Sequence, residues 1–328
     1  MAQHHHSRYA ETYQASMADR EGFWLNVAKS IDWVKPPSRA FDASQGVYGR
    51  WFPDAEVNTC YNALDRHIAA RGDQLAVIYD SPVAQSKRSL TYREMRDQVA
   101  RLAAVIRDQG VNKGDTVLIY MPMIPEALMA MLACARLGAV HSVVFGGFAS
   151  KELATRIEDA HPKLIIAASC GIEPNRVVAY KPLLDEAITL SAHKPGKVVL
   201  FQRPQAQASM VDGRDIDWVD AMTTAEKAGK TADCVPVKAT DPLYVLYTSG
   251  TTGKPKGVVR DNGGHLAALA WSVPNLYDIH AGDVFWTASD VGWVVGHSYI
   301  VYGPLVNGAT TLVYEGKPVG TPDPGAFW

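Results

Sequence analysis

Residues 243–257 read Leu-Tyr-Val-Leu-Tyr-Thr-Ser-Gly-Thr-Thr-Gly-Lys-Pro-Lys-Gly, an apolar run followed at once by a polar segment rich in glycine. Leu243–Tyr247 has the length and composition of a buried strand. Gly257–Arg260 predicts a second strand on the far side of the polar segment. We therefore expect the polar segment to be a loop at the end of a buried strand.

The chemistry of this loop suits a chain of phosphates. Glycines let backbone N–H groups approach anionic oxygens, hydroxyls add short donors, and lysines add positive charge. A Walker A pattern cannot be fitted to it, which disfavours an ordinary P-loop ATPase or kinase. On composition alone, a flexible polar turn remains an alternative. The predicted phosphate-binding residues are Thr248, Ser249, Gly250, Thr251, Thr252, Gly253, Lys254 and Lys256.

Upstream of the loop, short Val- and Ile-rich strands alternate with helices. Such alternation indicates right-handed βαβ units on a parallel sheet. The expected elements are a helix at Tyr92–Gln109, a strand at Asp115–Tyr120, a helix at Pro125–Leu137, a strand at Val140–Phe145, a helix at Ser150–Ala160 and a strand at Lys163–Ala168. The predicted fold class is α/β, with parallel sheets flanked by helices.

The chain divides into three predicted parts. Residues 1–85 have no regular period and form an irregular N-terminal cap. Residues 86–235 form a first α/β subdomain, and residues 236–328 begin a second one that contains the glycine-rich loop. Phe327 and Trp328 look like core residues at the start of an element, so we expect the chain to be truncated within a domain.

Composition excludes several classes of function. The 328 residues are 47% apolar and 20% charged, which is typical of a soluble globular protein. A net charge of -2 provides no basic field for nucleic acid or anionic lipid. No apolar run reaches the roughly 18 residues of a membrane span. We expect a cytoplasmic protein without a nucleic-acid or membrane partner.

A metal site is not predicted. His265, His280 and His297 share no metal-ligand spacing. The cysteines show no Cys-x-x-Cys pattern, so we expect reduced, mostly buried thiols and neither a disulfide framework nor a zinc site. These cysteines are Cys60, Cys134, Cys170 and Cys234.

The segment Tyr247–Gly257 resembles the signature of the adenylate-forming superfamily, which contains acyl-CoA synthetases, peptide-synthetase adenylation domains and luciferases. Val143–Phe148, Ala288–Tyr299 and the Trp-rich stretch Phe23–Trp33 resemble its short-chain acyl-CoA synthetase branch, with propionyl-CoA synthetases the closest likeness. The resemblance implies the N-terminal portion of the adenylate-forming fold, behind a cap of acyl-CoA synthetase type. It also implies that the loop holds the β- and γ-phosphates of ATP.

The resemblance assigns further residues. It places Trp293, Val294 and Val295 in the acyl pocket, although spacing alone favours Trp293 as a core aromatic. It places Gly146, Gly147 and Arg176 on the path of coenzyme A, where Gly146 and Gly147 also suit a tight turn. Relatives carry a second basic residue at the position of Glu173, so this part of the CoA contact is in question.

The implied reaction converts a short-chain carboxylic acid, ATP and CoA into acyl-CoA through an acyl-adenylate, with Mg²⁺ as the metal that accompanies ATP. Val295 replaces a threonine usual in acetate-specific relatives, which favours propionate and still admits acetate. The catalytic lysine and the mobile lid domain are expected beyond Trp328, so we expect this chain to be catalytically incomplete. Alternatives are a non-catalytic nucleotide-binding fragment and an adenylation domain that loads a carrier protein.

Overall fold

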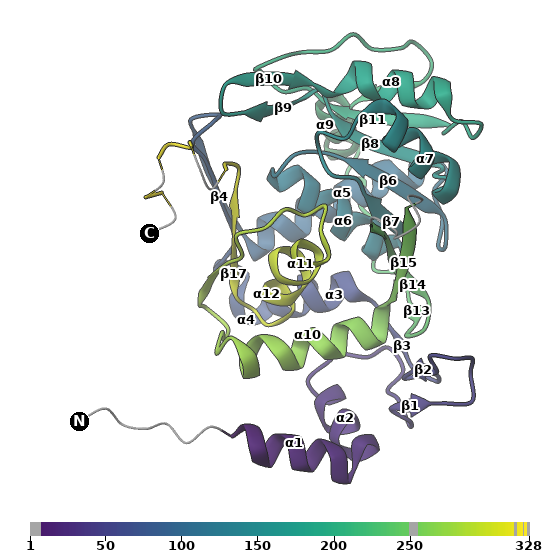
Figure 1. Ribbon diagram of the computed structural model, residues 1–328, viewed down its shortest axis with the longest axis vertical. Coiled ribbons are helices and arrows are strands. Elements are labelled where there is room, and N and C mark those ends of the chain that lie inside the picture. Colours follow the sequence, from purple (N-terminus) through teal and green to yellow (C-terminus); the bar gives the residue numbers. More distant parts are fainter. Residues whose placement is uncertain (1–7, 249–254, 318–319, 324, 327–328) are drawn as a thin grey trace.

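The computed structural model describes residues 8–248, 255–317, 320–323 and 325–326 (Figure 1). At one end of the molecule, helices α1 (Tyr9–Ala18) and α2 (Arg20–Ala28) lie below the long helix α10 (Asn262–Leu276), and α2 packs against it. The small hairpin of β1 (Phe41–Asp42) and β2 (Arg50–Trp51) lies beside them.

A seven-stranded sheet forms the centre of the fold, with strand order β12-β11-β8-β6-β7-β14-β15. Every neighbouring pair is parallel except the last, because β14 and β15 form an antiparallel hairpin. The strands are β6 (Thr116–Tyr120), β7 (Val140–Val143), β8 (Leu164–Ala168), β11 (Lys197–Phe201), β12 (Asp215–Asp217), β14 (Pro242–Thr248) and β15 (Lys256–Asp261). The predicted α/β class with parallel βαβ units is confirmed.

Helices cover both faces of this sheet. Alternate residues of β6 enter different cores, since Val117 and Ile119 pack in one cluster and Leu118 and Tyr120 in the other. The first cluster includes α6 (Pro125–Leu137), which is buried along its whole length. The helices of these two layers are α5 (Tyr92–Asp108), α6 and α9 (Trp218–Lys227) on one face and α7 (Ser150–Ala160) and α8 (Tyr180–Leu190) on the other.

Capping residues mark the ends of helices α5 and α6, as the sequence predicts. Thr91 and Glu94 form a capping box at the start of α5. Pro125 occupies the first turn of α6, and Gly138 ends that helix in the left-handed region with φ of 69°. The predicted boundaries of both helices are therefore confirmed to within a residue.

A second sheet has the order β16-β17-β4-β5. It joins β4 (Leu75–Ser81) and β5 (Ser86–Thr91) to β16 (Val284–Trp286) and β17 (Thr310–Tyr314), with β4 parallel to β17. Sequence analysis missed β4, which lies in the segment expected to be irregular. The three-part division of the chain stays a prediction.

Short elements complete the fold. Between β16 and β17 the chain is helical without a break only from Val294 to Val306, and the centre of this segment is a π-helix. None of the described helices is both long and apolar enough to cross a membrane. The remaining elements are β3 (Glu56–Val57), α3 (Thr59–Ala63), η1 (Asp65–His67), α4 (Ile68–Arg71), β9 (Cys170–Glu173), β10 (Arg176–Ala179), β13 (Val237–Lys238), α11 (Val294–Gly296), η2 (His297–Tyr302) and α12 (Gly303–Val306).

Candidate active site

The glycine-rich loop joins the two strands of the β14–β15 hairpin. At its base Thr248 and Lys256 are direct partners, and the Thr248 hydroxyl donates to the carbonyl oxygen of Lys256 at 3.5 Å. Both residues are exposed. The other predicted phosphate-binding residues, Ser249–Lys254, lie outside the described residues, so their role stays a prediction.

Helix α7 contacts the β14–β15 hairpin next to the base of the loop. The Tyr247 hydroxyl donates to an Asp159 carboxylate oxygen at 2.5 Å. The Arg156 guanidinium lies 5.7 Å from the Tyr247 ring centre and 4.6 Å from that of Phe148. Although charged, Arg156 is only 6% exposed. Arg156 therefore links the turn after β7 to the base of the phosphate loop.

The turn after β7 carries Gly146 and Gly147. A Cβ atom on Gly146 would lie 2.5 Å from the hydroxyl oxygen of Tyr180, so packing alone requires glycine there. Gly147 has φ of +132°, a conformation that other residues rarely adopt. The expected tight turn is confirmed. The contact of this turn with coenzyme A stays a prediction.

The predicted acyl-pocket residues lie against this same turn. The Trp293 ring lies 5.9 Å from the ring of Phe145, and a Cβ atom on Gly292 would touch the Phe145 backbone at 3.0 Å. Trp293 is 51% exposed, so the interpretation as a core aromatic is wrong. Val294 and Val295 are also exposed. The structure thus places an open apolar surface next to the end of β7.

The predicted CoA residue Arg176 lies on the β9–β10 hairpin. It is exposed and pairs in register with Glu173. The Glu173 carboxylate forms an ion pair of 3.4 Å with Lys317, whose ammonium group also lies 5.9 Å from the Phe145 ring centre. Sequence analysis did not single out Lys317, because its proximity to Glu173 depends on the tertiary fold. This lysine offsets the charge that makes Glu173 unsuited to a phosphate.

Three buried histidines lie directly behind the open surface. His297 packs against both His141 of β7 and Tyr244 of β14, at ring-centre distances of 5.5 and 4.5 Å. His297 Nδ1 lies 3.0 Å from the carbonyl oxygen of Trp293, so it is the protonated nitrogen that donates. Burial lowers the pKa of His297 to about 4 and that of His265 to about 3. These rings are therefore neutral near pH 7.

Comparison with protein families decides the family of the chain. Residues 64–328 match the model of the AMP-binding enzyme, and residues 9–63 match that of the acetyl-coenzyme A synthetase N-terminus. This chain belongs to the AMP-binding enzyme family. The resemblance noted at Tyr247–Gly257 and in the N-terminal region is confirmed.

Relatives within the AMP-binding enzyme family match nearly all of this chain. Human mitochondrial acyl-CoA synthetase short-chain family member 3 is 52% identical over 98% of the chain and 47% of the relative. The propionate–CoA ligase of Escherichia coli is 46% identical over 98% of the chain and 50% of the relative. An uncharacterized protein of Pseudomonas aeruginosa is 56% identical over 98% of the chain and 50% of its own length. The chain spans about half the length of the curated relatives it matches.

Proposed function

We propose that the protein activates a short-chain carboxylic acid with ATP and transfers the acyl group to coenzyme A. The observation that carries this proposal is the meeting of three segments at one edge of the large sheet. These are the base of the phosphate loop at Thr248 and Lys256, the turn at Gly146–Gly147 and the apolar surface at Trp293. The names of the relatives, a short-chain acyl-CoA synthetase and a propionate–CoA ligase, support it.

The reaction has two steps. A carboxylate oxygen of the acid attacks the α-phosphorus of ATP and pyrophosphate leaves, which gives the acyl-adenylate. The thiolate of coenzyme A then attacks the acyl carbonyl and AMP leaves. Residues Thr248–Lys254 together with Lys256 bind and neutralise the β- and γ-phosphates, and Mg²⁺ accompanies the nucleotide.

Trp293, Val294 and Val295 form one wall of the acid pocket. In an apolar pocket, one added methylene in the substrate changes selectivity by about 1–3 kcal/mol, or roughly 10- to 200-fold. The proposal is therefore that propionate is preferred to acetate. Gly147 and Arg176 lie along the path of coenzyme A, where Lys317 compensates Glu173. We further propose a cytoplasmic protein whose partners are the acid, ATP and CoA.

The test is ATP–pyrophosphate exchange with acetate, propionate, butyrate and isobutyrate. The protein translated from the complete open reading frame is used. We expect it to exchange best with propionate. Absence of exchange with every acid would refute the assignment of the acid pocket.

Nothing in the comparisons favours the two alternatives, a non-catalytic fragment and an adenylation domain that loads a carrier protein.

A further inference from the structure

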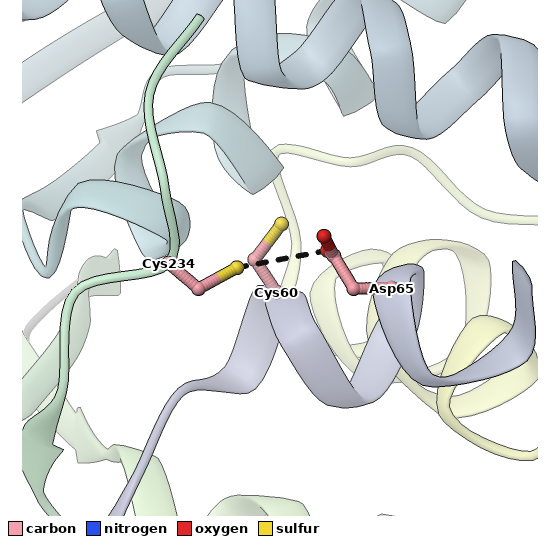
Figure 2. Close-up of side chains that lie close together, drawn as sticks. All are labelled: Cys60, Asp65 and Cys234. Carbon is pink, nitrogen blue, oxygen red and sulfur yellow. Dashed lines mark hydrogen bonds between the residues drawn. The ribbon is translucent and has the colours of Figure 1, made fainter.

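Two cysteines that are remote in the sequence meet beside a carboxylate, away from the candidate active site. Figure 2 shows Cys60 on helix α3, Asp65 on the turn that follows it, and Cys234 on the connector before β13. Their sulfur and carboxylate oxygen atoms lie within 4.8 Å of one another. The Cys234 thiol donates to Asp65 Oδ2 at 3.6 Å. Sequence spacing predicts isolated thiols, so only the fold reveals this pair.

Arg136 of helix α6 supplies the positive charge of the cluster. Its guanidinium binds both oxygens of Asp65, with Nη1 to Oδ2 at 2.7 Å and Nη2 to Oδ1 at 3.0 Å. Nη1 also donates to Cys60 Sγ at 3.8 Å. The side chain is 6% exposed. A divalent metal ion at this place would compete with the guanidinium for Asp65, so the contacts favour thiol chemistry over metal binding.

The two thiols differ in access. Cys60 is fully buried, whereas Cys234 is partly exposed. Interaction with Cys60 and burial raise the pKa of Cys234 well above its usual value. Negative charge that develops on the Cys60 sulfur is stabilised by the neighbouring guanidinium. One thiol can thus be reached from solvent, and the other has a cation at its sulfur.

We propose that Cys60 and Cys234 are a modification site, a dithiol that hydrogen peroxide converts into a disulfide. The Cys234 thiol passes its proton to Asp65 Oδ2, to which it already donates, as its sulfur attacks a peroxide oxygen. The hydroxide that leaves takes up this proton to form water. Cys60 also gives up its proton, and its thiolate attacks the sulfenic sulfur of Cys234. The S–S bond forms and hydroxide leaves, to be protonated to a second water. Two thiols are oxidised and one peroxide is reduced to two waters.

The bridge would join two segments that already lie together. Val237 of β13 pairs with Val57 of β3, close to both cysteines in the chain, so little backbone movement is needed. The connector continues into β14, which ends at Thr248 at the base of the phosphate loop. Because the bridge closes a long loop in the unfolded chain, the oxidised protein is expected to melt several degrees higher.

Non-reducing peptide mapping tests the proposal on the 328-residue chain, treated with millimolar hydrogen peroxide at pH 8. We expect one cross-linked peptide that contains Cys60 and Cys234, and reversal of the rise in Tm by a thiol reductant. Cys60→Ala and Cys234→Ser should abolish the cross-link. Cys134→Ala, which changes another buried cysteine, should leave it unchanged.

Two results would overturn the proposal. The first is oxidation of Cys234 to a sulfinic acid in the wild-type chain without any cross-link. The second is one zinc ion bound per chain that Cys234→Ser loses, since the cluster would then be a metal site. Because mapping needs no ligase activity, failure of this test is distinct from failure of the proposed reaction.

Discussion

The open surface at Trp293 and a buried polar network nearby differ in how far their side chains are exposed to solvent. Trp293, Val294 and Val295 are each more than 40% exposed. By contrast, Arg203 and Glu315 are nearly inaccessible and form a bidentate ion pair of 2.7 and 2.9 Å. Arg203 follows β11 of the large sheet and Glu315 follows β17 of the second sheet, so this pair ties the two sheets together. We infer that the first region serves binding and the second serves stability.

Breaking the buried pair should have the largest effect on stability. Tyr79 and Ser81 also donate to Glu315, so Glu315→Gln removes a charge on which three groups depend. It leaves Arg203 as a buried cation without a counter-ion, which costs about 3–5 kcal/mol. Urea unfolding measures the loss. Lys87→Gln, in the exposed pair with Asp80, is the control and should change stability by less than about 1 kcal/mol. A loss below that value in Glu315→Gln would contradict the assigned role.

A fall in pH should have the second-largest effect, because it destabilises the folded state through the buried histidines. Unfolded histidine has a pKa near 6.5, whereas His265 and His297 have folded values of about 3 and about 4. Between pH 6.5 and 4 only the unfolded chain binds these protons, so stability falls as pH falls. Each ring contributes a loss of about 2 kcal/mol at pH 5. Urea unfolding at pH 7, 6 and 5 measures it. His265→Gln should reduce the difference between pH 7 and 5, and exposed His280→Gln should not.

Gly146→Ala tests how tightly the turn after β7 packs against Tyr180. The new methyl group would press on the Tyr180 hydroxyl and cost about 1–3 kcal/mol. Tyr180→Phe removes that oxygen, so the double variant should lose less than the sum of the single variants. Chemical denaturation of all four proteins gives the coupling. Gly196→Ala, where the nearest atom lies 3.5 Å away, is the control. Strict additivity of the two changes would reject the steric explanation.

Trp293→Ala should have the smallest effect on folding. A half-exposed ring contributes little to the core, and we expect a loss of less than about 1 kcal/mol. The same variant, in the longest gene product, should lose acid-dependent ATP–pyrophosphate exchange if Trp293 lines the acid pocket. A loss of more than about 2 kcal/mol in stability would instead identify Trp293 as a structural residue and remove the contrast between the two regions.

Local sequence patterns predicted much of the central fold. Helices α5 and α6 were recognisable from apolar spacing and from capping residues such as Thr91, Pro125 and Gly138. The strands on either side of the phosphate loop were recognisable from their apolar runs. Of the site, the sequence predicted the turn at Gly146–Gly147 and the segment at Trp293. It missed Lys317 and the burial of Arg156, because both depend on contacts between distant segments.

The sequence by itself determined the family, the βαβ order and the two strands that flank the phosphate loop, because these depend on residues close together in the chain. The tertiary structure alone decided that β4 pairs with β17, that Arg156 lies against Tyr247, and that Cys60 meets Cys234. No local periodicity encodes such contacts. They arise when packing of the two sheets and their helices brings distant segments together, and burial then fixes which polar groups must pair.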